Sequence, residues 1–343
     1  MSLGLLDLLL ASSESLALCT VMQVKGSAPR HPGSWMLAGT GGLVAGSVGG
    51  GRGESLVLAA VREALADGAV RVLEVQMQGT EAEGTDMVCG GTSRVLVEPL
   101  ASKAAYAVAR ALLRRGERVL LARRTTTGES AAMDGSGTWS PAVPEGADRE
   151  AARFALEHGR PVLDAEAGLF YDPVLPPEKL LVLGGGHVGR AVAALAPALG
   201  FAVTVADDRP EFVAPSRFPA GVAAICGAFP ELVRDFPFDA ATYVVIVTRG
   251  HLADLESLRA VLGRPWRYAG LIGSRRKVRL LKEQVLADGC DPAKVAAVHA
   301  PIGLDIGAET PEELAVSIAG ELVAARRGVA APSLSRREPR GAS

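Results

Sequence analysis

The 343-residue sequence has few cysteines, few aromatic residues and almost no net charge. Its four cysteines, Cys19, Cys89, Cys226 and Cys290, lie far apart, which excludes a disulfide framework and the spacing of a zinc site. A formal net charge of -2 at pH 7 excludes the basic surface by which proteins bind nucleic acid. No apolar run approaches the roughly 18 residues of a membrane-spanning helix, and the first residues lack the basic region of a signal peptide. We therefore expect a cytoplasmic protein with reduced thiols that binds neither nucleic acid nor a membrane.

The stretch that organises the rest of the chain is a strand followed by a glycine-rich loop. The apolar run 180–183 predicts a buried parallel strand, and Gly184, Gly186 and Gly189 then form the pattern G-x-G-x-x-G ahead of a helix over 190–200. In a dinucleotide-binding unit the first glycine makes a tight turn, the second lets a phosphate approach the backbone, and the third lets the helix pack on the strand. The N-terminus of such a helix also offers free N–H groups to an anion.

An acidic pair follows the next predicted strand. The strand 202–206 ends at Asp207 and Asp208, about 20 residues after the loop, where an acidic residue can bind the ribose hydroxyls of a dinucleotide. We select Asp207 as the candidate ribose ligand, and His187, inside the loop, as a further cofactor contact. The alternative is a doubly wound domain that keeps the glycine turn and binds no nucleotide.

Strands and helices alternate through the second half of the chain, which predicts a parallel sheet with helices on both faces. We therefore expect an α/β protein in which a mixed α+β domain, 1–175, precedes a Rossmann-like doubly wound domain, 176–329. The tail 330–343 is rich in Pro, Arg and Ser and is expected to be disordered. The strands of the second domain are predicted over 180–183, 202–206, 222–226, 243–247, 268–272 and 297–299.

Two further segments of this domain are candidates for binding an anion. Ser274 is followed by Arg275, Arg276 and Lys277, which open a predicted helix, and three cations in a first turn oppose the helix dipole. A bound phosphate would relieve that conflict, and the alternative is that the cations extend into water. The other segment, 247–254, follows the predicted strand 243–247 and carries Arg249 and His251 at the strand edge where open α/β sheets bind ligands.

Three segments of the first domain combine glycine with chemically active side chains. They are the loop 25–33 with Lys25 and Arg30, the run Gly49-Gly50-Gly51 ahead of Glu54, and Cys89-Gly90-Gly91. A cysteine before two glycines lies on open backbone, which suits a reactive or ligand-binding thiol. The other three cysteines lie in or beside apolar runs and are expected to be structural. Glu54 in the first turn of a predicted helix, 54–65, has the alternative role of complementing the helix dipole.

Taken together, these motifs resemble the XdhC/CoxI family, the accessory proteins of xanthine dehydrogenase and related molybdenum hydroxylases. The resemblance covers nearly the whole chain in the same order. The motifs that carry it are 25–30, 49–51 with Glu54, 87–91, 184–189, 207–212, 273–277 and 301–307.

The resemblance implies a protein that binds molybdenum cofactor, as molybdopterin or its dinucleotide form, and holds it for sulfuration and insertion into a client molybdenum hydroxylase. It implies a cofactor chaperone rather than a turnover enzyme, with a cysteine desulfurase as a further partner and a homodimer as the assembly. Cys89 is implied as the molybdenum ligand, since a thiolate suits this soft centre. We expect the cofactor to reach from Cys89 to the glycine loop at Gly184, where phosphates are held with the help of Ser274 and Arg275.

Two other functions remain open at this point. The glycine loop and Asp207 would equally suit an NAD(P)-dependent oxidoreductase, although no proton donor with a partner is visible in the sequence. The third hypothesis is a scaffold protein that docks to a client and whose Rossmann site binds no nucleotide.

Overall fold

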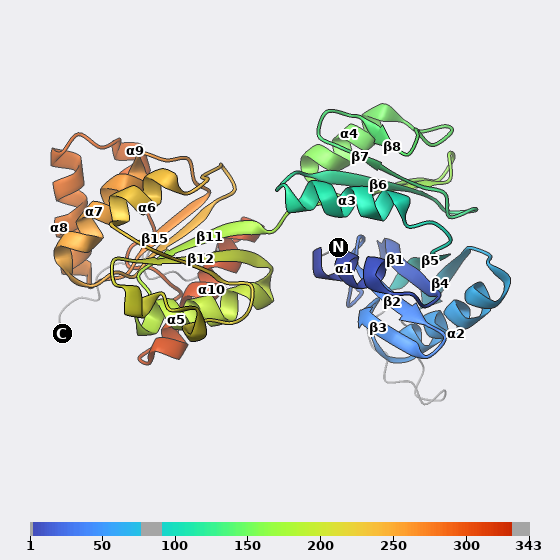
Figure 1. Ribbon diagram of the computed structural model, residues 1–343, viewed down its shortest axis with the longest axis horizontal. Helices are drawn as coiled ribbons and strands as arrows, with labels where there is room; N and C mark the ends of the chain where they lie inside the picture. Colours follow the sequence, from blue (N-terminus) through green and yellow to red (C-terminus); the bar gives the residue numbers. More distant parts are fainter. Residues whose placement is uncertain (1–2, 77–90, 331–343) are drawn as a thin grey trace. The chain divides into compact units, whose positions relative to one another are not determined.

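The computed structural model describes residues 3–76 and 91–330, and the chain forms two compact units, Met1–Pro176 and Pro177–Ser343 (Figure 1). The tail predicted to be disordered lies, from residue 331 onward, outside the described residues. The two units have different architectures: antiparallel sheets in the first and a parallel sheet in the second.

The first unit is built from two antiparallel sheets of five strands each. One sheet has the order β3-β2-β1-β5-β4 and the other β8-β7-β6-β10-β9. The strands of the first sheet are β1 (Leu16–Lys25), β2 (Trp35–Gly39), β3 (Gly42–Gly46), β4 (Arg71–Gln76) and β5 (Thr92–Pro99). Those of the second are β6 (Val119–Arg124), β7 (Ser130–Met133), β8 (Trp139–Ser140), β9 (Val162–Asp164) and β10 (Leu169–Val174).

The two sheets are copies of one topology. Each has a helix before its first strand, α1 (Leu3–Ala11) or α3 (Ala104–Arg114), and a helix after its third, α2 (Gly51–Asp67) or α4 (Arg149–His158). The order helix, three strands, helix, two strands therefore occurs twice, a repeat that the sequence motifs do not predict. The copies differ in their loops: the first copy has the longer connections between its first and second strands and between its last two strands.

The hydrophobic core of this unit has one central and two outer clusters, besides a small one formed by Met22, Leu96 and Phe170. The central cluster joins α1 and α3 to the inner faces of both sheets, with Leu6, Leu18, Tyr106 and Leu121 among its buried members. On the outer faces, α2 packs on the first sheet and α4 on the second. The alternation of side chains along each strand explains this division, since neighbouring residues point to opposite faces.

A fully buried arginine joins the two sheets. Arg123 of β6 has no exposed surface, and its guanidinium donates to Thr20 Oγ1 of β1 at 2.6 Å and to Asp172 Oδ2 of β10 at 2.8 Å. The indole N–H of Trp35 donates to the same Asp172 oxygen at 2.8 Å. Contacts from both sheets therefore converge on one ion pair.

A second carboxylate shares the same guanidinium. Glu98 Oε2 lies 3.7 Å from Arg123 Nη1 and has no hydrogen-bond partner, while Glu98 Oε1 accepts the hydroxyl of Tyr106 at 2.7 Å. Burial raises the pKa of Glu98, and the charge of Arg123 opposes that shift. Removing Arg123 would leave two buried carboxylates without a cation.

The second unit contains a five-stranded parallel sheet in the order β13-β12-β11-β14-β15, which confirms the predicted Rossmann-like fold. Its strands are β11 (Glu178–Leu183), β12 (Phe201–Asp207), β13 (Ala223–Cys226), β14 (Tyr243–Ile246) and β15 (Tyr268–Leu271). The predicted strand 297–299 is wrong except at His299, which forms an isolated parallel bridge with Gly270. The helix α9 (Pro292–Ala297), capped by Asp291, runs through the first residue of that segment.

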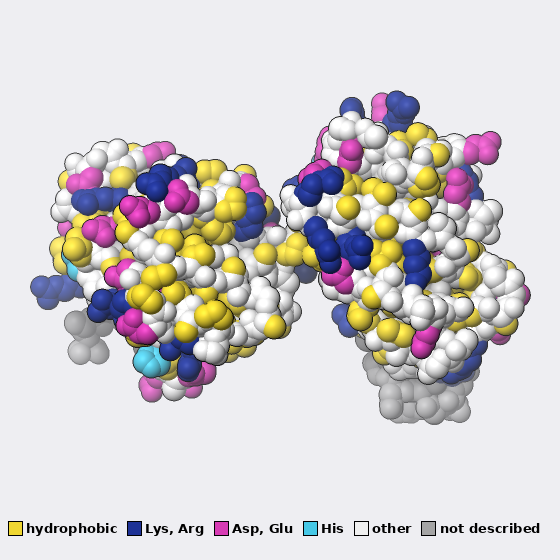
Figure 2. Space-filling model, viewed as in Figure 1, with side chains coloured by type: hydrophobic (Ala, Val, Ile, Leu, Met, Phe, Trp, Pro, Cys, Tyr) yellow, Lys and Arg dark blue, Asp and Glu magenta, His cyan; other side chains and the backbone are white. Residues whose placement is uncertain are grey.

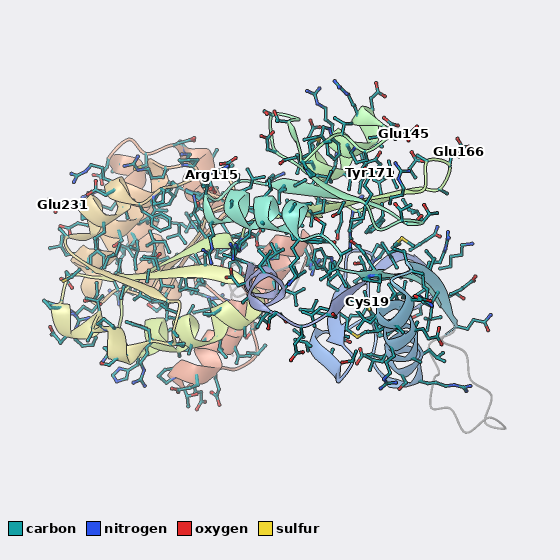
Figure 3. All side chains as sticks on the ribbon, turned by 45° about the vertical axis from the view of Figure 1, so that its right-hand side comes forward. Cys19, Arg115, Glu145, Glu166, Tyr171 and Glu231 are labelled. Carbon is teal, nitrogen blue, oxygen red and sulfur yellow. The ribbon has the colours of Figure 1, made fainter. Side chains whose placement is uncertain are left out.

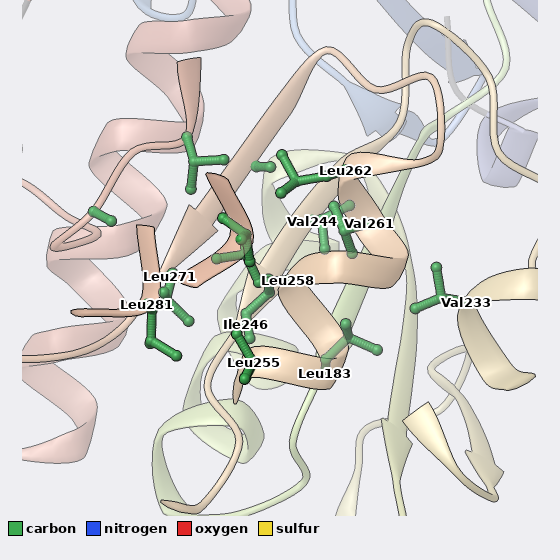
Figure 4. Close-up of a cluster of buried hydrophobic side chains, with 14 of the residues drawn as sticks. Leu183, Val233, Val244, Ile246, Leu255, Leu258, Val261, Leu262, Leu271 and Leu281 are labelled. Carbon is green, nitrogen blue, oxygen red and sulfur yellow. The ribbon is translucent and has the colours of Figure 1, made fainter. Parts of the chain in front are cut away.

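Helices cover both faces of this sheet. On one face lie α5 (His187–Leu195), continued by a 3-10 turn, 196–199, and α10 (Pro311–Arg327). On the other lie α6 (Phe229–Asp235), α7 (Gly250–Leu262), α8 (Arg275–Ala287) and α9. Figure 4 shows the core on this second face, where Leu255, Leu258 and Val261 of α7 pack near Val244 and Ile246 of β14.

The surface carries charges of both signs. Basic and acidic side chains are interspersed over the face of each unit that Figure 2 shows. No helix in the described ranges 3–76 and 91–330 is both long and apolar enough to cross a membrane.

We predict that Arg123→Met lowers the free energy of unfolding of the first unit by roughly 3–5 kcal/mol, because it leaves buried carboxylates unpaired. Urea unfolding followed by tryptophan fluorescence measures this change, since Trp35 belongs to the same network. The control is Arg115→Met, which removes only an exposed ion pair to Glu117 and should cost less than about 1 kcal/mol. Equal losses in the two variants would contradict the role given to Arg123.

Candidate functional site

The motifs of the first unit meet at one edge of its first sheet. The antiparallel pairing places Lys25, the end of β1, opposite Thr92, the start of β5, and Met36 of β2 opposite Gly46, the end of β3. The loop 26–34, the segment 47–51 and Gly91 therefore leave the sheet at the same edge. Sequence motifs that are far apart in the chain are brought together there.

Gly91 packs directly against the predicted loop. A Cβ at this position would lie 2.2 Å from the carbonyl oxygen of Ser27 and 2.8 Å from that of Lys25, so only glycine fits. Cys89 and Gly90 lie outside the described residues. Their roles, and the expectation that one cofactor reaches both units, stay predictions.

The glycine run of the first unit is held by a carboxylate. Glu54 Oε2 accepts the hydroxyl of Ser47 at 2.7 Å and the N–H groups of Val48 and Gly50 at 3.3 Å each. The helix α2 begins at Gly51 rather than at Glu54 as predicted, because positive φ angles at Gly50 and Gly51, 77° and 59°, lead the chain into it. Glu54 therefore fixes the loop, a role that its place in the first helical turn did not reveal.

The described residues leave space beyond that carboxylate. No described atom lies within 4 Å of a Cβ placed at Gly50 or Gly51. This opening favours a contact with a bound molecule, which for Gly49, Gly50 and Gly51 stays a prediction.

A pocket of about 730 Å³ borders the same edge. Its wall combines apolar side chains of α1 with polar groups of the loop 26–34 and of the segment after β3. Arg30 brings a guanidinium with no ion-pair partner among the described residues, and Ser34 and Ser47 bring hydroxyls. Such a lining can hold a flat organic molecule that carries an anionic group. The main lining residues are Leu5, Leu8, Arg30, Ser34, Trp35 and Ser47.

The three described cysteines lie in different surroundings. Cys19 is buried within the first unit (Figure 3), and burial raises the pKa of its thiol far above the usual range. Cys226 is exposed at the end of β13, and Cys290 is half-buried. Among residues 3–76 and 91–330, no group of three or more His, Cys, Asp or Glu side chains could hold a metal ion.

The glycine loop of the second unit has the geometry of a nucleotide-binding turn. Gly184 has a φ of 111°, and a Cβ there would lie 2.4 Å from the carbonyl oxygen of Val247. A Cβ at Gly189 would lie 1.8 Å from the carbonyl oxygen of Gly184, so this glycine lets α5 pack closely. No described atom lies within 4 Å of a Cβ placed at Gly186. The pattern assigns the tight turn to Gly184, the close helix packing to Gly189 and the approach of a phosphate to Gly186.

Comparison with known proteins identifies the family at this point. Two family models match the chain, "XdhC and CoxI family" over residues 9–76 and "XdhC Rossmann domain" over residues 180–322. The chain belongs to the XdhC and CoxI family.

Known relatives of this XdhC-family chain align with it over most of its length. A probable xanthine dehydrogenase subunit of Bacillus subtilis (strain 168) is 29% identical over 338 residues, which are 95% of this chain and 98% of the relative. Uncharacterized protein YqeB of Escherichia coli (strain K12) is 27% identical over 90% of this chain, which spans only 43% of that relative's length. A crystal structure of a xanthine dehydrogenase from Bacillus halodurans shares the fold, with a TM-score of 0.82 and 24% identity, over 100% of this chain and 98% of that one.

Asp207 of this XdhC-family chain is held within the protein. Its side chain is 1% exposed, Oδ2 accepts the N–H of Gly185 at 2.7 Å, and Oδ1 accepts the backbone N–H and Nε of Arg209 at 3.1 and 2.9 Å. Burial alone would raise the pKa of Asp207, but the bonds from Arg209 and Gly185 outweigh it and hold the pKa below its usual value. Ribose binding by Asp207 stays a prediction.

Asp208 is the more accessible of the acidic pair. Its side chain is 41% exposed, and it lines a pocket of about 510 Å³ with Ala228, Arg249 and His251. This pocket lies at the carboxyl edge of the sheet, as predicted for Arg249 and His251. His187 is exposed as the first residue of α5.

The cations at the start of α8 differ in their surroundings. Lys277 forms an ion pair with the buried Asp254 of α7, whose other oxygen accepts the hydroxyl of Thr248 at 2.5 Å. Ser274 caps α8 by accepting the N–H of Lys277 at 3.3 Å. Arg275 is exposed, and its predicted contact with a phosphate stays a prediction.

We predict that Glu54→Ala loosens the first glycine loop, because the N–H groups of Val48 and Gly50 lose their acceptor. Hydrogen exchange at these two amides should quicken by about tenfold or more, the equivalent of one lost hydrogen bond to a charged group. Glu63→Ala is the control, since Glu63 lies on the exposed face of the same helix. An unchanged exchange rate in Glu54→Ala would show that the conformation of the loop does not depend on the Glu54 carboxylate.

We predict that Asp207→Asn lowers the free energy of unfolding at neutral pH by roughly 1–3 kcal/mol, since the bonds to a charged acceptor are weakened. The pKa of Asp207 is lowered in the folded protein. Its contribution is therefore complete above the unfolded pKa of about 3.9 and is lost as the pH falls through the folded value. Urea unfolding from about pH 3 to 7 should show the difference from wild type shrinking at acid pH. A pH-independent difference would contradict this assignment.

Proposed function

We propose that this protein binds molybdenum cofactor and serves as an accessory protein to a xanthine dehydrogenase-type molybdenum hydroxylase. Membership of the XdhC and CoxI family supports the accessory role, as does a relative that is named a probable xanthine dehydrogenase subunit. The proposed task is to hold the cofactor for sulfuration and to insert it into the client, with a cysteine desulfurase as the sulfur donor and a homodimer as the working assembly.

One observation carries the proposed site. Gly91, which follows Cys89 and Gly90 in the sequence, packs on the carbonyl groups of Lys25 and Ser27, at the edge where the glycine run and Arg30 also lie. In this proposal the Cys89 thiolate binds the molybdenum, because this metal with its dithiolene prefers soft ligands. Arg30 and the hydroxyl of Ser34 hold the anionic end of the pterin.

The chemistry of the residues fits this cargo. The pocket of about 730 Å³ falls within the size range of ligand sites and offers both apolar and polar walls. The loop carboxylate Glu54 positions the glycine run and does not contact the cargo in this proposal. When bound, the cofactor brings the redox chemistry that the client enzyme uses, and this chain orients and shields it.

The glycine loop of the second unit supports a further proposal, that Gly184, Gly186, Gly189, Ser274 and Arg275 bind a nucleotide. The strand order of the parallel sheet and the space that the described residues leave at Gly186 favour a dinucleotide. This nucleotide is either part of the molybdenum cofactor or NAD(P), and in the latter case an oxidoreductase is the second candidate function.

We predict that Cys89→Ala abolishes retention of molybdenum and pterin when the chain is purified from cells that make the cofactor, because its soft ligand is lost. Molybdenum is measured by mass spectrometry and the pterin by fluorescence after oxidation. Cys226→Ala is the matched control, since Cys226 is exposed and lies in the second unit. Equal retention by Cys89→Ala and wild type would overturn the assignment of Cys89.

A further inference from the structure

A polar cluster lies at the edge of the parallel sheet opposite the glycine loop. Arg267 and Tyr268 stand at the start of β15, whereas the loop from Gly184 follows the end of β11, and parallel strands all start at the same edge. His299, bridged to Gly270, and Glu321 of α10 complete the cluster. The function proposed above uses none of these side chains.

Glu321 fixes the proton on the imidazole of His299. Only 3% of Glu321 is exposed, and its Oε2 accepts both the hydroxyl of Tyr268 and the N–H of Gly303, each at 2.7 Å. Glu321 Oε1 lies 3.1 Å from His299 Nδ1. A carboxylate that already takes two donors acts as an acceptor, so Nδ1 carries a proton, and in the neutral imidazole Nε2 is then the acceptor.

The imidazole forms part of the wall of a pocket of about 400 Å³. The side chain of His299 is 25% exposed, and no described residue forms a hydrogen bond with its Nε2. Arg267 lines the same pocket with a guanidinium that is 42% exposed. Its Nη2 donates to the carbonyl oxygen of Arg326 at 2.8 Å, and its Nη1 lies 3.6 Å from Glu178 Oε1, so its other N–H donors face the pocket or water. Tyr268 and Glu321 also line the pocket, and the rest of the wall includes the apolar side chains of Leu304, Ala324, Ala325 and Val329.

We propose that this pocket binds a small phosphate-bearing molecule. The pocket offers an acceptor, His299 Nε2, beside a cation, Arg267. A phosphate group that keeps one P–OH matches both, since the hydroxyl donates to Nε2 while the anionic oxygens accept from the guanidinium. A simple carboxylate or a sulfate lacks the hydroxyl at neutral pH. The apolar wall leaves room for the organic part of a phosphate ester.

Hydrogen phosphate and sulfate provide a matched pair of probes. At about pH 8 the two ions have the same charge and shape but differ by one O–H. The experiment records the imidazole nitrogens of the full chain, labelled with nitrogen-15 at its five histidines, during titration with each ion. Phosphate should shift the His299 Nε2 signal. It should also bind at least about tenfold more tightly than sulfate, because one additional hydrogen bond changes the affinity by about this factor.

Variants test the two contacts separately. Arg267→Gln and His299→Gln should each weaken phosphate binding by about tenfold, whereas His158→Gln, in the other unit, should leave it unchanged. Tighter binding of methyl phosphate than of inorganic phosphate at about pH 6 would identify an ester as the ligand, and the reverse order the free ion. Equal binding of sulfate, a shift only at His187 or His251, or unchanged affinity in Arg267→Gln would overturn the proposal. None of these outcomes bears on cofactor retention through Cys89.

Discussion

Backbone N–H groups in a glycine-rich loop need acceptors, and in both units of this protein a carboxylate supplies them. Glu54 takes the N–H groups of Val48 and Gly50, and Asp207 takes that of Gly185. Both loops are therefore held in place by the protein itself. The two carboxylates also occupy positions that an anion would otherwise take, so a ligand can approach only the backbone that they leave open.

The fold of the first unit explains why only one of its two sheets carries the candidate site. The two copies of its topology are joined through the buried Arg123 and share one central hydrophobic cluster. Only the first copy has the long connections and the glycine run, at the edge where Gly91 packs on the loop 25–27. The first copy thus presents the loops that we assign to the cofactor.

The second unit could be predicted well from the sequence because its signals are local. The strand, the glycine loop and the capped helices each lie within a short segment, and the pattern of alternation implies the parallel sheet. The repeat in the first unit could not be predicted because antiparallel pairing joins distant strands without a shared motif. The partner of Lys277 is hidden for the same reason, since Asp254 lies on another helix. The sequence singles out Glu54 and Asp207, but their contacts with the loops require the three-dimensional structure.

We place the cofactor over the loops at the edge of the first sheet. Hydrogen exchange measured by mass spectrometry, with and without bound molybdopterin, tests this placement directly. We expect slower exchange of the amides in the loop 26–34, in the segment 47–51 and at Gly91 when the cofactor is bound. Protection confined to the second unit, with these amides unchanged, would contradict the placement.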